Sequence, residues 1–137
     1  MGRSAEILQS HGLKKTGIRI KVIEMLDKMP YAVSQPELES HLSEEADRVT
    51  IYRTLNTLEE KGIVHKVIDR EGLSRFAMCS SGCSEHKHHD EHLHFQCTRC
   101  SNIYCLSIPV EAQFNLPQGF EIHQMRIYVD GICKTCT

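Results

Sequence analysis

The sequence predicts an α+β protein with a helical first half and a strand-rich second half that a metal ion stabilises. Up to about Gly62, apolar residues recur with helical spacing and no cysteine occurs. Beyond Gly62, β-branched and aromatic residues gather in short runs. All seven cysteines lie in this second part. With 137 residues and 40% hydrophobic content, the chain fits one domain or two very small ones.

Two helices are expected before residue 30. Ile7 and Leu8 belong to a short amphipathic stretch that ends at residues 11–12, where His-Gly follows. Thr16 or Gly17 caps the second helix, which Met29-Pro30 terminates. Apolar residues recur near the helical period between these two points.

Two further helices complete the first half. Ser34 begins the third, and Glu37 stands three residues later as in a capping box. The fourth opens at residues 48–50, presents Leu55 on an apolar stripe, and closes at Gly62. Strand signals at 63–68 and 73–78, separated by the turn sequence Asp-Arg-Glu-Gly, predict a hairpin. Short helices followed by a hairpin are the outline of a winged helix-turn-helix.

The second half is expected to be a separate small domain. The Ser/Gly/Cys stretch at 79–84 resembles a hinge, and strands are expected at 92–96, 103–106 and 120–129, with a short helix near 109–114. This half is too small for an independent apolar core, so a zinc ion or a partner subunit is expected to stabilise it. The predicted division is 1–78, a hinge and His-rich loop at 79–89, and 90–137.

Four cysteines form two Cys-x-x-Cys pairs, which supply a complete tetrahedral ligand set for a structural zinc ion. The four are Cys97, Cys100, Cys133 and Cys136. No signal peptide or membrane span is apparent, so a cytoplasmic protein is expected, and a reducing cytosol favours metal binding over disulfides. A redox-active dithiol is disfavoured because no thioredoxin-like pattern accompanies the pairs.

The fourth helix is a candidate for reading DNA. Ile51 and Leu55 would face the core, while Thr50, Tyr52 and Arg53 would project outward near the helix N-terminus. Arg can bond a guanine edge and Tyr can pack on a thymine methyl. Net charge is −2, so any basic surface must be local. The alternative is an ordinary exposed helix whose Tyr and Arg have no role in DNA binding.

The run VTIYRTLNTLEEKGIVHKV, at 49–67, closely resembles the recognition helix and first wing strand of the ferric uptake regulator family. The resemblance extends through the His-rich run to the final cysteine pair. It implies a winged-helix domain, an α/β dimerisation domain, and a homodimer that binds palindromic double-stranded DNA operators when metal-loaded. It also implies phosphate contacts from Lys14, Lys15 and Arg19, and base contacts from Tyr52 and Arg53. A non-enzymatic repressor is therefore expected.

The expected sensing site departs from the iron and peroxide sensors of that family. Ala32 stands where those relatives have a histidine, Cys105 where they have a carboxylate, and Met125 where they have another histidine, which the nearby His123 could replace. His65 and Cys79 instead resemble the zinc-uptake-regulator branch.

With His-x-His of that branch matched at residues 92–94, the expected regulatory ligands are His65, Cys79, His92 and His94. Imidazole and thiolate suit Zn²⁺ better than an oxygen-rich ferrous site, although Fe²⁺ or Mn²⁺ remains an alternative. The plain alternatives are a partly exposed strand histidine at 65 and a buried small hydrophobe at 79.

A further metal site is the least constrained expectation. Its candidate ligands are His86, His88, Asp90 and Cys105. A solvated His-rich loop that scavenges metal is the alternative for these residues.

The sequence thus predicts a zinc-responsive dimeric repressor of metal-uptake genes. Rivals are an iron or peroxide sensor of the same family, a zinc storage or trafficking protein, and a zinc hydrolase. The hydrolase lacks a His-Glu-x-x-His helix and would leave the recognition helix unexplained.

Overall fold

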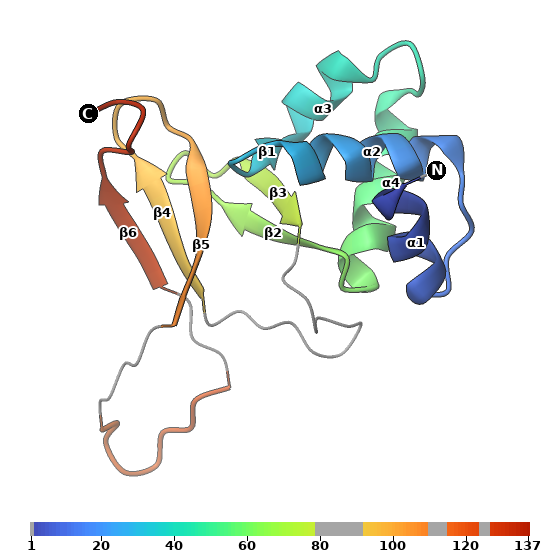
Figure 1. Cartoon of the computed structure of the whole chain (residues 1–137). Helices are drawn as coiled ribbons and strands as arrows, with labels where there is room; N and C mark the ends of the chain where they lie inside the picture. Colours follow the sequence, from blue (N-terminus) through green and yellow to red (C-terminus); the bar gives the residue numbers. More distant parts are fainter. Residues whose placement is uncertain (1, 79–91, 110–114, 124–126) are drawn as a thin grey trace. The chain divides into compact units, whose positions relative to one another are not determined.

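The computed structural model describes residues 2–78, 92–109, 115–123 and 127–137 (Figure 1). The chain forms two compact units, Met1–His88 and His89–Thr137, and each is described by itself. Within the described part of the chain, no helix is long and apolar enough to span a membrane.

The described part of the first unit contains four helices, as the sequence predicts: α1 (Arg3–Ser10), α2 (Gly17–Lys28), α3 (Gln35–His41) and α4 (Arg48–Glu60). Side chains cap three of them. Thr16 accepts a hydrogen bond from the Arg19 N–H, and Ser34 accepts one from the Glu37 N–H, which is half of the expected capping box. Asp47 accepts one from the N–H of Thr50 at the start of α4, at 2.8 Å.

The expected hairpin consists of β2 (Val64–Ile68) and β3 (Ser74–Met78), which pair antiparallel. In its turn, Asp69 accepts hydrogen bonds from the backbone N–H groups of Glu71 and Leu73, and its side chain contacts the Arg75 guanidinium at 3.0 Å. A third strand, β1 (Val33–Ser34), pairs with β3, giving the order β1-β3-β2. The sequence did not predict β1 because two residues are too few to show a periodicity.

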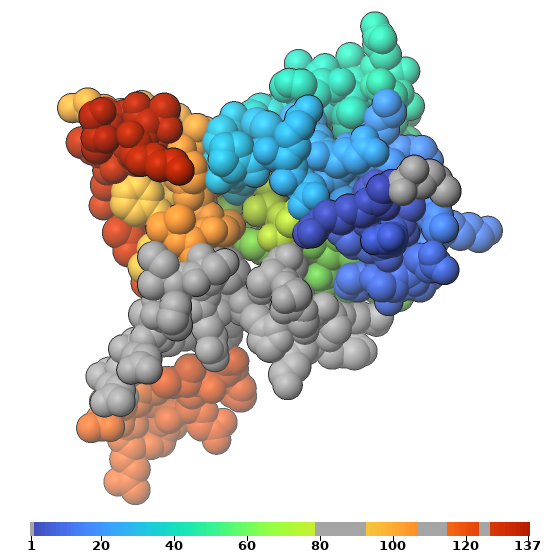
Figure 2. All heavy atoms as spheres, viewed as in Figure 1, coloured from blue at the N-terminus to red at the C-terminus, as the bar shows by residue number. Residues whose placement is uncertain are grey.

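The helices and the hairpin enclose one apolar core. Figure 2 shows the side chains of the helices in close contact on the face in view. Leu55 and Leu58 of α4 are fully buried there. The core also holds Leu8, Val22, Ile23, Met25, Leu26, Val33, Leu38, Leu42, Ile51, Ile63, Val64 and Phe76. The stripes inferred from helical periodicity are therefore the faces that pack together.

The second unit is a three-stranded sheet of β4 (His92–Cys97), β5 (Ile103–Pro109) and β6 (Ile127–Gly131), in the order β5-β4-β6. β4 pairs antiparallel with β5 and parallel with β6. Gly131 permits a close approach, because a Cβ atom there would lie 2.8 Å from the Phe95 ring. A larger residue at this position would force the two strands apart.

Two expectations for this unit need correction. The strand expected at 120–129 begins only at Ile127, and residues 120–123 are not in a strand. Gly119 has φ 97° in a turn where the Phe120 N–H bonds the Pro117 carbonyl, and Phe120 and Ile122 are exposed rather than facing a core. The helix expected near 109–114 is also wrong at its start, because Pro109 ends β5; residues 110–114 lie outside the described part.

Candidate metal centre and DNA-contact surface

The four cysteines of the two Cys-x-x-Cys pairs come together in the second unit. Their sulfur atoms all lie within 4.8 Å of one another, and the sulfurs of Cys100 and Cys133 are 3.8 Å apart. A tetrahedral zinc ion with Zn–S bonds of about 2.3 Å requires sulfur–sulfur separations of about 3.8 Å. The donor set and this spacing therefore fit a structural zinc ion.

Local backbone geometry places Cys97 and Cys133 at the centre of this cluster. Cys97 ends β4, and its sulfur accepts hydrogen bonds from the N–H groups of Arg99, Cys100 and Cys133 at 3.4–3.5 Å. The Arg99 guanidinium donates to the Cys136 carbonyl at 3.0 Å, which ties the first pair to the second. The turn after Cys97 is completed by Ser101, a non-glycine residue with φ 66°.

Hydrogen bonding makes the pKa values of Cys97, Cys133 and Cys136 unequal. The N–H groups of Cys100 and Cys133 lower the pKa of Cys97 to about 6. A hydrogen bond from Tyr104 lowers the pKa of Cys133, whereas hydrogen bonding to Cys133 and burial raise the pKa of Cys136 to about 12. The cluster thus holds some protons near neutral pH, and a metal ion has to displace them to bind all four thiolates.

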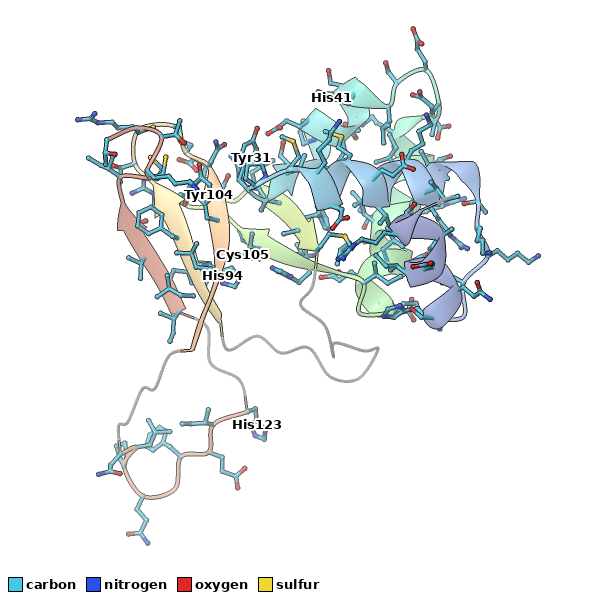
Figure 3. The ribbon with its side chains drawn as sticks, viewed as in Figure 1. Tyr31, His41, His94, Tyr104, Cys105 and His123 are labelled. Atoms are coloured by element: carbon cyan, nitrogen blue, oxygen red, sulfur yellow. The ribbon has the colours of Figure 1, made fainter. Side chains whose placement is uncertain are left out.

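A second pair of donors faces across the hairpin formed by β4 and β5. His94 and Cys105 are directly paired in the antiparallel register, and their ligand atoms lie within 4.8 Å of each other; Figure 3 shows the two side chains next to one another. His94 is buried and stacks on Tyr128 of β6 with ring centroids 5.3 Å apart. Burial raises the pKa of Cys105 to about 12, so without metal it is a neutral thiol.

His94 and Cys105 belong to two different sets of ligands in the expectations from sequence, the regulatory site and the further site. The hairpin turn after Cys97 could have revealed their proximity, since pairing Gln96 with Ile103 also pairs His94 with Cys105 two residues further along each strand. The register of the β4–β5 pair is therefore the signal that could have placed the two donors together.

The other expected metal ligands are distributed as follows. His65 lies on β2 of the first unit, opposite Ala77, and is buried. His92 begins β4. His123 is exposed, with its ring nitrogen 3.6 Å from the Glu121 carboxylate. Cys79, His86, His88, Asp90 and Met125 lie outside the described residues.

The expected DNA-reading side chains share the exposed face of α4. Tyr52 is 53% exposed, and Thr50 and Arg53 are exposed as well, while Leu55 and Leu58 face the core. Thr50 has an additional role: hydrogen bonds from its side chain and its backbone N–H hold the pKa of Asp47 below the ordinary value. These hydrogen bonds fix the N-terminus of α4. In helix-turn-helix proteins this end of the recognition helix meets the DNA.

The basic residues predicted to contact phosphates lie just before and within the start of α2. Lys14 and Lys15 are exposed, and the Arg19 guanidinium donates to the Lys14 carbonyl at 3.1 Å. This bond holds the backbone that carries the two lysines. The side chains of both lysines extend into solvent.

Comparisons with known proteins agree with this fold. The model of the ferric uptake regulator family matches residues 10–130. A ferric uptake regulation protein of Vibrio cholerae is 30% identical over 148 residues, covering 98% of this chain and 93% of that protein.

Solved structures share the fold, and two of them are compared with this chain. One described as a zinc uptake regulator complexed with zinc and DNA has a TM-score of 0.66 at 22% identity, covering 96% of this chain and 88% of the other. A Pseudomonas aeruginosa ferric uptake regulator with manganese has a TM-score of 0.61 at 20% identity, covering 97% and 99%. The family match over most of its length shows that the chain belongs to the ferric uptake regulator family of metal-responsive transcriptional regulators, which are not enzymes.

Proposed function

We propose that this protein is a zinc-responsive repressor of metal-uptake genes that binds palindromic DNA operators as a homodimer in the cytoplasm. A zinc ion bound by Cys97, Cys100, Cys133 and Cys136 stabilises the second unit. A second zinc ion is the signal that controls DNA binding.

The observation that carries the zinc assignment is the pairing of His94 with Cys105 across the β4–β5 hairpin. An imidazole and a thiolate form a soft donor pair that favours tetrahedral Zn²⁺ over Fe²⁺ or Mn²⁺, which prefer oxygen-rich sites. We therefore move Cys105 from the further site into the regulatory set. His86, His88 and Asp90 remain candidates for an additional site.

The regulatory ion would act by joining the two units. His65, on the wing strand β2, and Cys79, which follows β3 in the sequence, would complete a tetrahedral set of four ligands with His94 and Cys105, and His92 is the alternative donor. Zinc binding would then favour the arrangement in which α4 of each protomer meets its operator half-site. A coupling of roughly 1–3 kcal/mol would change operator affinity by about one to two orders of magnitude.

Association into a homodimer is supported by apolar side chains that the second unit leaves in solvent. Tyr128 and Val129 of β6 are 49% and 37% exposed. Ile132, Phe120 and Ile122 are more than 40% exposed in the same unit. Burial of these side chains against a second copy would remove apolar surface from water, which is the main driving force for obligate association.

The proposal is tested by measuring DNA binding at buffered free zinc concentrations. The duplex used is one selected by the wild-type protein from a random-sequence pool. The variants Cys105→Ser, His65→Ala and Cys79→Ser should each shift the zinc response to higher concentrations. Since thiolate and imidazole ligands must lose protons, wild-type affinity should also fall on acidification.

His11→Gln is the matched control, because His11 follows α1 as its C-cap and its ring contacts the Ile7 carbonyl at 2.8 Å and the Ser10 hydroxyl at 3.2 Å. It should leave the zinc response unchanged. An unaltered response in the three ligand variants as well would reject the regulatory site, and the absence of any zinc-dependent DNA binding would reject the whole proposal.

Iron sensing is the second candidate, since the curated relatives are named ferric uptake regulation proteins. An anaerobic titration of DNA binding with each metal separates the two. Activation by Fe²⁺ at lower free concentration than by Zn²⁺ would favour the iron sensor.

A further inference from the structure

A polar hollow lies in the first unit beside the start of the predicted recognition helix. Its volume is about 330 Å³, and it is bordered by α3, the first residue of α4, and the hairpin. The lining residues are Gln35, Pro36, Glu39, Arg48, Gly72, Leu73 and Ser74. At about 30 Å³ for each water molecule, the hollow has ample room for a phosphodiester group.

Arg48 is the cation of this hollow, and a carboxylate on the neighbouring helix holds it. The Arg48 Nε atom lies 3.3 Å from Oε1 of Glu39, and the Gln35 side-chain amide donates to the same oxygen at 3.2 Å. The Arg48 side chain is 83% exposed and that of Glu39 only 20%. Contact through Nε leaves the terminal guanidinium nitrogens able to donate to another anion.

The position of Arg48 relates the hollow to DNA. It is the first residue of α4, one helical turn before Tyr52, so the two side chains leave neighbouring parts of the same helix. When the N-terminal end of a recognition helix enters the major groove, the preceding helix crosses the DNA backbone. The hollow lies between α3, the first residue of α4 and the hairpin turn, and it would then face a backbone phosphate.

We propose that Arg48 binds a DNA phosphate. In the free protein Arg48 pairs with the Glu39 carboxylate, and a backbone phosphate displaces this carboxylate when DNA binds. This proposal rests on the DNA-binding function proposed above. An exposed ion pair contributes only about 0–1 kcal/mol, so the exchange has a small cost, while an arginine–phosphate contact is charge-assisted and releases a counterion.

The two residues should then have opposite effects on DNA affinity. Arg48→Gln should weaken binding and reduce the slope of log affinity against log salt by about 0.9, so its deficit should shrink about 3.5-fold between 50 and 200 mM salt. Arg48→Lys should retain the wild-type slope. Glu39→Gln should bind up to about fivefold more tightly at low salt, because Arg48 no longer has to leave a partner.

The measurements use the zinc-loaded full chain, the duplex selected by the wild-type protein, and a second duplex of unrelated sequence. A phosphate contact affects both duplexes equally. Asp27→Asn is the matched control. Asp27 pairs with Arg3 at 3.0 Å, and both side chains are substantially exposed. Like Glu39→Gln, this variant frees an arginine and removes one negative charge, but it does so at the far end of α2. It should not alter affinity.

An unchanged salt slope in Arg48→Gln, or weaker binding by Glu39→Gln, would overturn the proposal. Thermal unfolding of each variant verifies that the surface substitutions leave the fold intact. Arg53→Ala reports separately on the proposed function. If the wild-type protein binds no duplex, the DNA-binding function fails; if Arg53→Ala loses binding while both Arg48 variants behave as wild type, only the present inference fails.

Discussion

Among its described residues, the first unit buries fourteen apolar side chains in one cluster, drawn from the four helices, the three strands and the residues next to them. Among the described residues of the second unit, the buried residues classed as hydrophobic are Cys97, Ile103 and Cys133, and two of these are sulfur donors. Its buried polar residues include His94 and Gln96. We therefore expect the two units to be stabilised differently: the first by burial of apolar side chains, and the second by a metal ion bound to its clustered cysteines.

Removal of the structural metal should have the largest effect, and it should be confined to the second unit. Structural zinc sites contribute on the order of 10 kcal/mol of folding free energy. Chelation, or the variant Cys136→Ser, should therefore abolish protection from amide hydrogen exchange in β4–β6. The amides of α2 and α4 should remain protected, because their core contains no metal ligand.

The readout is hydrogen exchange resolved by segment, together with zinc quantification after denaturation. Thr137→Ala is a suitable control, because Thr137 adjoins Cys136 but its hydroxyl bonds only the Lys134 carbonyl, at 3.0 Å. If the strands of the second unit stayed protected without metal, the contrast between the units would be incorrect.

A cavity in the first unit should produce the converse result. Leu55 is fully buried in the core, so Leu55→Ala should destabilise this unit by about 3–4 kcal/mol through lost burial and the cavity left behind. The second unit should still bind one equivalent of zinc at its cysteines. Chemical denaturation followed by helix circular dichroism measures the first effect, and a competitive chelator measures the second. A matching loss of zinc affinity would indicate that the two units fold as one.

The same contrast explains which features the sequence could reveal. The helices of the first unit follow from periodicity and caps, because Leu55 and Leu58 face one core and Ser34 and Asp47 bond the first turns. The cysteine cluster follows from ligand type and spacing. The two-residue strand β1 carries no pattern.

In the second unit, burial no longer determines where apolar residues lie, and the strand prediction failed for that reason. Phe120 and Ile122 have the alternation of a strand but are exposed. The proximity of His94 and Cys105 depended on register, which local sequence patterns do not encode directly. The regulatory ligand expected at residue 79 and the further-site ligands expected at residues 86, 88 and 90 stay predictions.

The smallest predicted effect concerns a buried charge pair of the first unit. Asp69 and Arg75 pair at 3.0 Å with side chains only 1% and 10% exposed. Burial opposes ionisation of Asp69, but hydrogen bonds from the Leu73 N–H and from Arg75 outweigh it and hold the pKa of Asp69 below the ordinary value of 3.8. Asp69→Asn should lower the free energy of unfolding by about 2 kcal/mol at pH 7, since it leaves Arg75 buried without its counter-charge while the amide oxygen still accepts hydrogen bonds.

This loss should depend on pH in a defined direction. A carboxylate whose pKa is depressed on folding contributes its stabilisation above the unfolded-state value, here near 3.8, and loses it as pH falls through the lower folded-state value. The difference between wild type and Asp69→Asn should therefore be constant from pH 7 to about pH 5 and shrink below pH 4. Any acid release of zinc affects both proteins equally and cancels in that difference.

Asp27→Asn breaks a pair of the same 3.0 Å length whose side chains are 69% and 35% exposed, so it should cost at most about 1 kcal/mol. Equal losses for the two variants would mean that burial of the Asp69–Arg75 pair adds nothing, and that the first unit is stabilised by its apolar core alone.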